Sequence, residues 1–536
     1  MIYLMLQKKL IQNLIKIIKN NKIYFYVLLL STSALIFTFY YGYRGILPID
    51  SFLIYDSGYK VLNGFHPFKD YWSITGPILD YIQYFFFKFF GINWFSYVFH
   101  AAIINLLLSI ILFYFFLKLG LNKFFSFVYS LSASVLAYPS IGTPFMDHHA
   151  VIFSLISVML LILSFKTDKA IYWFLVPIFL LLSFFSKQIP SSYFLLFFPV
   201  MILINGIINS FNNFRHVYYL LLGSSISILF FVAIFIVNQI PFNNFITQYI
   251  YYPQIIGNDR GSNIILNLSN VIFQFKFIYL SMLPLSVIFV KYIKTNKKNL
   301  EIKKDLLIIL LVCISILIFI YSQILTKNQI LIFFLIPFCL GISHYYIKKY
   351  YNKKLIIKLL LITLIFTTLK YHLRFNENKK FMELSNVDLK LAIDAGVLDD
   401  SLKGLFWITP KYPKDPLNEI NKLKEIKKDL ETDLTKKIII SDYQILPSIV
   451  KLKSLAPNKW FDILSVPNKN NKYFAIYKKF FIKKLKSQNI QTIYVVGKKE
   501  VFLVNIFEKN CYEKKVINKI AFKIDIKNCL ILTSKN

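Results

Sequence analysis

The sequence has few acidic residues for its size. Its 536 residues include 27 Asp and Glu against 62 Lys and Arg, which gives a formal net charge of +35. Such an excess of positive charge can indicate nucleic-acid binding. Here, however, the lysines gather in short loops between apolar runs and in the C-terminal tail, and no motif that reads bases is present. We therefore expect no nucleic-acid partner.

The sequence also lacks the glycine-rich motifs of nucleotide-binding proteins. It contains neither a Walker A sequence nor a dinucleotide-binding fingerprint. It has no internal repeat and no low-complexity linker. The absence of repeat halves argues against a transporter, because many transporter folds are built from two related halves.

Cysteine is scarce, with four residues in the whole chain. Cys313 and Cys339 fall inside apolar runs, where small buried thiols are expected. Cys511 and Cys529 lie in the tail, where they could form a disulfide if the tail is exported and would stay reduced in the cytoplasm. Spacing alone does not show whether their Cα atoms come within about 7 Å, so both alternatives stay open.

Hydrophobic residues, by contrast, make up 56% of the chain, and 55 Phe and 36 Tyr raise the aromatic content to 18%. The mean hydropathy is +0.55. A membrane-spanning helix needs roughly 20 mostly apolar residues, and about eleven runs approach this length. We predict an all-α polytopic membrane bundle over residues 1–369 with helices at 23–42, 95–117, 124–141, 149–165, 171–185, 190–210, 217–238, 270–290, 306–325, 329–347 and 355–369.

Loop charges predict how the bundle is oriented, because positively charged loops stay cytoplasmic. Lysines precede the first run, and no convincing cleavage site follows it, so we expect a retained first helix with a cytoplasmic N-terminus. The outer side then carries the loop 43–94, the turns at Asp147 and Lys187, the loop 239–268 and Lys327. We expect the protein to lie in the inner membrane. Because the N-terminus is cytoplasmic and the number of predicted spans is odd, the tail is expected to be extracytoplasmic. The N-terminal lysines are Lys8, Lys9, Lys16, Lys19 and Lys22.

The tail, residues 370–536, mixes acidic and basic residues and has apolar runs too short to span a bilayer. Helical spacing over Pro416–Leu434 and from Tyr473 alternates with strand-like runs from Lys436 and Ile490. About 165 residues suffice for one domain. We therefore predict a soluble, extracytoplasmic α/β domain.

The first outer loop is the most distinctive segment. Asp56 opens a helical stretch that Asn63 and Gly64 close, and Asp70 precedes an aromatic pair. An amphipathic run follows over 78–90 and could lie in the membrane interface. The loop thus places two acids among ordered turns at the membrane surface.

This pattern resembles the GT-C glycosyltransferases, especially the branch of protein mannosyltransferases and the aminoarabinose transferase of lipid A, over about residues 50–200. The resemblance implies that the first-loop acid, here Asp56, is the catalytic base or orients the acceptor. A carboxylate can take a proton from an attacking hydroxyl; the alternative is a helix N-cap. Asp70 is a second candidate. The matching residues are Asp56, Gly64, Pro67, Asp70, Pro77 and Phe90–Gly91.

The second signal is GTPFMDHHA from Gly142, which places Asp147, His148 and His149 at a hairpin. The resemblance implies that Asp147 helps to hold a metal or the acceptor. Asp with a neighbouring His could bind a divalent ion, so His148 is a candidate metal ligand. Neighbouring residues on one helix point about 100° apart, however, so Asp147 and His148 cannot both bind one ion easily. The alternative is that these residues form a polar helix cap.

The third signal is Lys187, a charge within apolar sequence on the predicted outer side. The resemblance implies that a cation here contacts the phosphate of a polyprenyl-phosphate sugar donor; snorkelling to lipid headgroups is the alternative. Arg260 and Lys327 are further candidates for donor phosphate binding. The alternative is that the aromatic residues around them belong to the belt of aromatic side chains found at a membrane–water interface.

The expected function is transfer of a sugar from a polyprenyl phosphate to an envelope glycan, lipid or protein. An O-antigen ligase or polymerase is the nearest alternative, although the 239–268 loop is only weakly basic. A lipid-linked oligosaccharide flippase or transporter and a non-catalytic assembly or sensor protein are further alternatives. A transferase needs its acids and phosphate-binding cations at one membrane face, and the predicted topology places all six charged candidates there.

Overall fold

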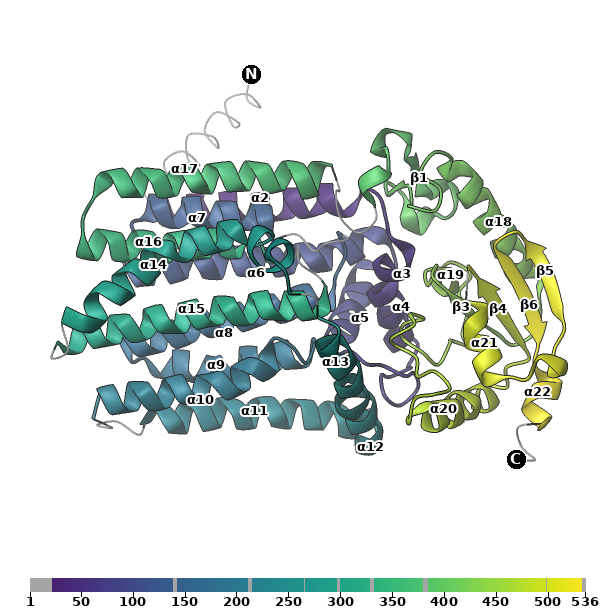
Figure 1. The fold of residues 1–536 in the computed structure, drawn as a ribbon. Coiled ribbons are helices and arrows are strands. Elements are labelled where there is room, and N and C mark those ends of the chain that lie inside the picture. Colours follow the sequence, from purple (N-terminus) through teal and green to yellow (C-terminus); the bar gives the residue numbers. More distant parts are fainter. Residues whose placement is uncertain are drawn as a thin grey trace, which may run out of the picture.

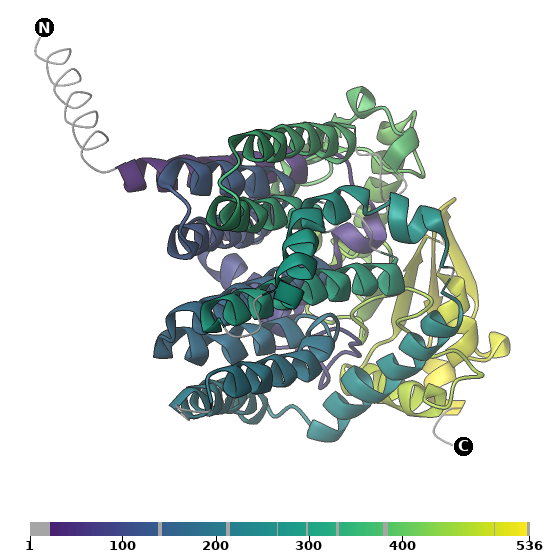
Figure 2. The same ribbon diagram turned by 60° about the vertical axis from the view of Figure 1, so that its left-hand side comes forward.

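The computed structural model describes residues 22–137, 142–210, 215–264, 266–295, 299–327, 332–378, 384–497 and 499–532. The lysines expected to precede the first helix, apart from Lys22, lie outside these ranges. Figures 1 and 2 show a bundle of long helices with a C-terminal region, residues 384–532, against one end. We call this end, where the first loop also lies, the loop end.

Each of the predicted apolar runs contains a helix. Among the described residues, eight helices are long and apolar enough to cross a membrane, whereas α7 and α9 are shorter apolar helices. At 1.5 Å per residue α7 spans only about 21 Å, less than the roughly 30 Å of a bilayer core, so the count of eleven spans stays a prediction. The helices are α2 Lys22–Gly42, α6 Trp94–Leu119, α7 Lys123–Leu136, α8 Met146–Thr167, α9 Ala170–Phe184, α10 Ser191–Ile208, α11 Arg215–Val237, α14 Lys276–Thr295, α15 Leu300–Thr326, α16 Leu335–Tyr350 and α17 Lys354–Tyr371.

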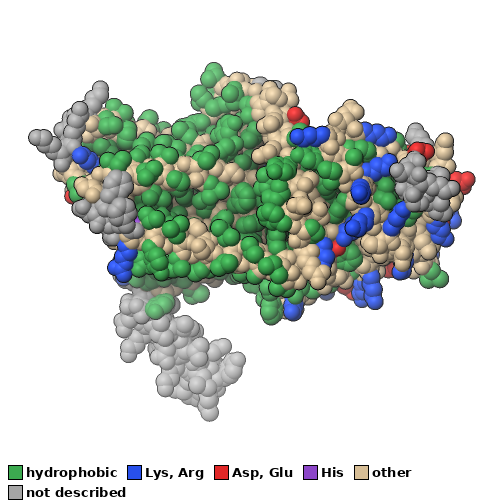
Figure 3. Space-filling model, turned by 90° about the horizontal axis from the view of Figure 1, so that it is seen from below, with side chains coloured by type: hydrophobic (Ala, Val, Ile, Leu, Met, Phe, Trp, Pro, Cys, Tyr) green, Lys and Arg blue, Asp and Glu red, His purple; other side chains and the backbone are tan. Residues whose placement is uncertain are grey.

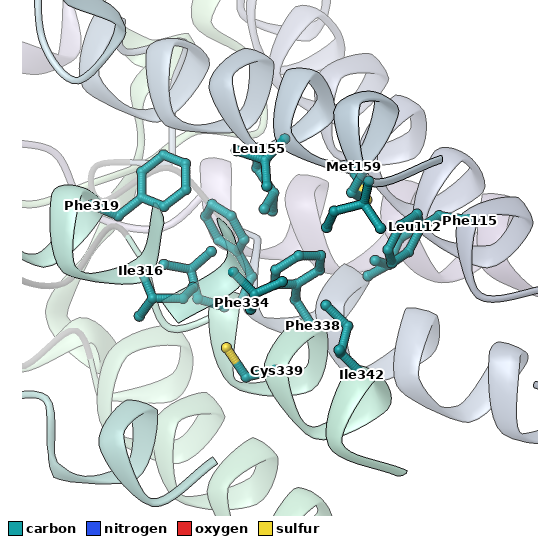
Figure 4. Close-up of a cluster of buried hydrophobic side chains, with 14 of the residues drawn as sticks. Leu112, Phe115, Leu155, Met159, Ile316, Phe319, Phe334, Phe338, Cys339 and Ile342 are labelled. Carbon is teal, nitrogen blue, oxygen red and sulfur yellow. The ribbon is translucent and has the colours of Figure 1, made fainter. Parts of the chain in front are cut away.

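The bundle packs around α8, whose side chains are almost all buried. Figure 4 shows Leu155 and Met159 of this helix facing Leu112 of α6, Ile316 of α15 and Phe338 of α16. Apolar side chains also cover the outside of the bundle, while Lys and Arg gather at its ends and over the C-terminal region (Figure 3). An apolar belt with charges at both ends is what a bilayer requires, so this is a membrane protein.

Short helices at the loop end connect the bundle to the C-terminal region. The predicted amphipathic run forms α5 with the expected bounds: Asp80 and Gln83 are buried on one face, whereas Phe85 and Phe89 are 53% and 74% exposed. The exposed rings suit the membrane interface. The connecting elements are α3 Pro48–Ser51, α4 Leu53–Leu62, α5 Ile78–Phe90, α12 Phe242–Phe245, η1 Ile246–Tyr251, α13 Tyr252–Ser262, η2 Ser269–Phe273 and η3 His372–Glu377.

The C-terminal region contains a four-stranded sheet in the order β3-β4-β6-β5. β3 (Lys437–Ser441) and β4 (Thr492–Val496) are parallel and wholly buried, which fits their continuous β-branched sequences. β6 (Ala521–Asp525) is antiparallel to β4 and to β5 (Lys514–Asn518). The remaining elements are β1 Ile393–Asp394, β2 Phe406–Trp407, α18 Pro416–Thr432, α19 Leu446–Ile449, α20 Phe474–Ser487, α21 Glu500–Ile506, α22 Lys527–Leu532, and the turns η4 Leu384–Asn386, η5 Leu389–Leu391, η6 Ala395–Val397, η7 Asp400–Leu402 and η8 Lys509–Cys511.

Backbone hydrogen bonds join the C-terminal region to the first loop. Trp72 N–H donates to the carbonyl of Pro457 at 3.1 Å, and Lys459 N–H donates back to the carbonyl of Trp72 at 2.9 Å. At a second place, Gly45 N–H donates a hydrogen bond to the carbonyl of Phe406 at 2.9 Å. The C-terminal region therefore forms part of the structure that holds the loop.

The two tail cysteines form a disulfide. Cys511 and Cys529 are 18 residues apart and their Cα atoms are 4.9 Å apart. Because a bridge restricts the unfolded chain, Cys511→Ser with Cys529→Ser is expected to lower the unfolding free energy of the C-terminal region by about 2–4 kcal/mol. Denaturant unfolding followed by limited proteolysis of the region measures this loss. Cys313→Ala in α15 is the control, and equal stability of the two variants would contradict the expectation.

Candidate functional site

Asp56 lies inside the loop helix α4 and not at its N-cap. The helix begins at Leu53, after Phe52, so the carboxylate is in the first turn and makes a side-chain pair in place of a cap. Its Oδ2 is 2.6 Å from Nζ of Lys60, one helical turn further on. Acid and base four residues apart share one face of a helix, which explains the pair. The N-cap alternative is therefore wrong.

The C-terminal region covers Asp56. Gln444, three residues after β3, donates from Nε2 to Asp56 Oδ2 at 3.1 Å and to the carbonyl of Lys459 at 2.7 Å. Asp56 also lines a cavity of about 10 Å³ together with Ser441 and Phe461. Such a volume holds about one water molecule. The carboxylate is thus shielded from bulk solvent in this conformation.

Sequence reasoning missed a second buried carboxylate, Asp80 of α5. Its Oδ1 accepts from Ser57 Oγ at 2.8 Å and from Lys459 Nζ at 2.6 Å, and its Oδ2 accepts from Tyr71 OH at 2.7 Å. Asp80 and Gln83 are polar residues three apart in a run that is mostly aromatic and aliphatic, which could have indicated a buried polar face. Lys459 gave no such signal, because its partner is 379 residues away.

Asp56, Lys60, Asp80 and Lys459 form what we call the charge cluster. None of the four side chains is more than 3% exposed. Burial raises the pKa of Asp56 and the nearby Asp80 carboxylate adds to this, whereas Lys60 and Gln444 oppose it. Burial lowers the pKa of the Lys459 ammonium against the opposing effect of Asp80. Two carboxylates facing two ammonium groups keep the cluster neutral, which burial requires.

A second ion pair joins two of the predicted outer turns. Asp147 lies in the first turn of α8, where an acid interacts favourably with the helix dipole. Its Oδ1 is 2.5 Å from Nζ of Lys187, which lies in the turn between α9 and α10. Burial lowers the pKa of Lys187 and the Arg260 charge lowers it further, while Asp147 raises it. The structure therefore pairs Asp147 with Lys187 and places Arg260 near enough for its charge to act on Lys187.

The Lys187 turn is tied to the first loop. Gly76 N–H donates to the carbonyl of Ser186 at 3.1 Å, and Ile78 N–H donates to the carbonyl of Phe185 at 3.2 Å. Gln188 donates from Nε2 to the carbonyl of Ile74 at 3.0 Å. A side chain at Gly76 would overlap the backbone of Phe185, so this approach requires glycine. The loop that carries Asp56 and the turn that carries Lys187 thus form one structure.

The other candidates lie apart from these clusters. Asp70 pairs with Lys484 of α20 at 2.9 Å and accepts from the His66 N–H at 2.9 Å. Lys327 ends α15 in a left-handed conformation and is exposed.

His148 is buried in α8 with Nε2 2.9 Å from the carbonyl of Ala137. Within the described ranges no three or more His, Cys, Asp or Glu side chains gather as metal ligands. A divalent ion at Asp147 and His148 stays a prediction.

No model of a known protein family matches the chain, and no curated protein sequence matches it significantly. The residues of the loop end and their chemistry are therefore what points to a function.

Proposed function

We propose that the protein is a membrane glycosyltransferase of the GT-C type. It moves a sugar from a polyprenyl-phosphate donor to a hydroxyl of an envelope glycan, lipid or protein. The observation that carries this proposal is the joining of two charged sites at the loop end. The loop that holds Asp56 is hydrogen-bonded directly to the turn that holds Lys187.

The proposed chemistry uses these two sites together. Asp56 takes the proton of the acceptor hydroxyl as the acceptor oxygen bonds to the anomeric carbon. The bond from that carbon to the donor phosphate breaks, and its electron pair leaves with the phosphate. Lys187 and Arg260 stabilise the charge that develops on the phosphate oxygens, with Lys327 as a third cation at the same end. Asp147 holds the Lys187 ammonium in place before the donor binds.

The C-terminal region controls access to Asp56 in this proposal. Gln444 and a cavity of about 10 Å³ leave no room for a sugar beside the carboxylate. An acceptor reaches Asp56 when the C-terminal region moves away from the first loop. The region is therefore proposed to alternate between covering the loop and admitting the acceptor.

The proposed location is the inner membrane, with the loop end and the C-terminal region on the extracytoplasmic side. Loop charges support this orientation. The Cys511–Cys529 bridge supports it independently, because disulfides persist in oxidising compartments. The donor and the acceptor are then both found at the outer face.

The proposal is tested by transfer of radiolabelled sugar from a panel of synthetic polyprenyl-phosphate sugars to envelope glycolipid and glycan. The purified protein is reconstituted in vesicles for the assay. Lys187→Gln is expected to lower transfer by about 100-fold, since one charge that stabilises the leaving group is lost. Both kcat and kcat/KM are expected to fall.

Two variants control for structural damage. Lys187→Arg keeps the positive charge beside Asp147 and is expected to retain most of the transfer, and Lys123→Gln at the opposite end of the bundle is expected to have no effect. Transfer by Lys187→Gln at the wild-type rate would remove Lys187 from donor binding. A folded wild-type protein that uses no donor of the panel would count against polyprenyl phosphates as substrates.

A further inference from the structure

A group of three cations lies where α14 begins and α17 ends, at the loop end (Figure 1). Lys276 opens α14, Lys370 lies in the last turn of α17, and Arg374 follows one turn later in η3. Together with Gln274 they line a cavity of about 70 Å³, which has room for several water molecules or one phosphate group. We call this the cation pocket.

Among the described residues that line the cation pocket, none is an acid that could balance its charge. Lys370 lies near enough to Lys276 and Arg374 for the like charges to repel. Over the described ranges, none of the three side chains makes a hydrogen bond or an ion pair. Their close contacts are with aromatic rings; Lys370 Nζ, for example, is 4.7 Å from the ring centre of Phe277.

The acid on the same helical turn is engaged elsewhere. Glu377 of η3 pairs with Arg44 at 3.6 Å and with His372 at 3.2 Å, and it accepts from Tyr40 OH at 2.7 Å. As far as the chain is described, these three repelling cations around one cavity therefore have no paired counter-ion. A bound anion would relieve the repulsion.

Stacked aromatic rings also line the pocket. The ring centres of Phe333 and Tyr371 are 3.9 Å apart, and those of Phe333 and Phe375 are 5.4 Å apart, with nearly parallel planes. All three side chains are at most 5% exposed. Buried, stacked apolar rings beside three cations suit a group that is charged at one end and attached to lipid at the other.

The outer faces of the two helices show where such a ligand would come from. Leu283 of α14 is 57% exposed, and Phe366 and Leu369 of α17 are 52% and 56% exposed. These apolar side chains are suited to acyl chains. The pocket thus lies at one end of exposed apolar helix faces, where the headgroup of a bound lipid would meet its acyl chains.

We infer that the cation pocket binds the phosphate group of an anionic membrane lipid. The guanidinium of Arg374 and the ammonium groups of Lys276 and Lys370 would donate to the phosphate oxygens. Either a glycerophospholipid or a polyprenyl phosphate carries this group. The inference does not depend on the proposed transferase activity, because the pocket shares no residue with the charge cluster or with the Lys187 turn.

The test measures lipid retained by the purified full-length protein with native mass spectrometry. The protein is equilibrated in phosphatidylcholine with phosphatidylglycerol in one arm and with a polyprenyl phosphate in the other. Lys276→Gln/Lys370→Gln/Arg374→Gln is expected to bind the anionic lipid about 100-fold more weakly, since each cation near a membrane surface contributes about fivefold. Lys479→Gln/Lys483→Gln/Lys486→Gln in α20 removes the same charge and is expected to bind as the wild type does.

Weaker binding in one arm identifies which lipid supplies the phosphate, and weaker binding in both shows that the phosphate alone is recognised. Unchanged binding of both lipids by the triple variant would overturn the inference. If the triple variant is not monodisperse, Lys370→Gln and Arg374→Gln are measured singly. Each is then expected to weaken binding by about fivefold, and no weakening by either would likewise overturn the inference.

Discussion

Replacing Asp56 with asparagine is expected to lower sugar transfer by a factor of about 10² to 10⁴, the usual contribution of a positioned general base. The single substitution also has a structural effect. It leaves the Lys60 ammonium, 1% exposed, without its counter-charge. Breaking a buried pair from one side costs roughly 3–5 kcal/mol. Loss of activity from this variant alone would not separate chemistry from folding.

A charge-neutral double variant makes the separation. Asp56→Asn with Lys60→Met removes both charges and is expected to unfold close to the wild-type temperature, yet to remain inactive. Transfer from a polyprenyl-phosphate sugar and thermal unfolding are measured on the same preparation. A double variant that is as active as the wild type would show that Asp56 serves only to pair with Lys60, and Asp147 would become the first candidate base.

The pH dependence of transfer gives a second readout. Asp56 acts as a base only when ionised, and burial raises its pKa above the ordinary value of an aspartate. The rate is therefore expected to fall as the pH drops through that raised pKa. Lys60 lowers the pKa of Asp56, so Lys60→Met is expected to move the acid limb of the profile to higher pH. A limb that stays in place would assign it to another group.

Lys459→Met is expected to cost about 3–5 kcal/mol in unfolding free energy, because Asp80 is then buried without a counter-charge. Asp80→Asn with Lys459→Met is expected to recover most of the loss. Denaturant unfolding of the purified protein measures both. Hydrogen exchange should locate the effect in α4 and α5, since Asp80 lies in α5 and accepts a hydrogen bond from Ser57 of α4.

The pair of Asp70 and Lys484 provides the matched control. It also joins the first loop to the C-terminal region, but its side chains are 17% and 20% exposed. Solvent weakens such a pair, so Lys484→Met is expected to cost about 1 kcal/mol or less. If Lys459→Met were no more damaging than Lys484→Met, the charge cluster would not be what fixes the C-terminal region on the loop.

Hydropathy and periodicity predicted much of this architecture. The apolar runs all contain helices, the amphipathic run over 78–90 has the expected bounds, and the strands from Lys436 and Ile490 pair within one sheet. These patterns are local, so the sequence of a single segment is enough to predict whether it forms a helix or a strand. The number of spans is harder to predict, because packing inside a bundle tolerates helices such as α7 that are shorter than the bilayer core.

The candidate site was predicted only in part, for a physical reason. Asp147 and Lys187 could be placed at one end of the bundle from loop charges, and they form an ion pair there. Lys459 and Gln444 could not be found, because their contacts join segments almost 400 residues apart and leave no periodic trace. Asp80 left only the local signal of its spacing from Gln83 in α5. The start of α4 at Leu53 was also missed, since a short helix at Pro48–Ser51 leads into it.

The distance along the chain between Asp80 and Lys459 has a consequence for biogenesis. At ribosomal rates of 5–20 residues per second, the 379 residues between them take about 20 to 80 s to synthesise. During that interval the first loop has been made, but the Asp80 carboxylate cannot yet pair with Lys459. The loop therefore cannot mature when it emerges, and its final structure depends on the last part of the chain to leave the ribosome. Premature termination before residue 459 would leave a bundle with an unfinished surface, which quality-control proteases can recognise.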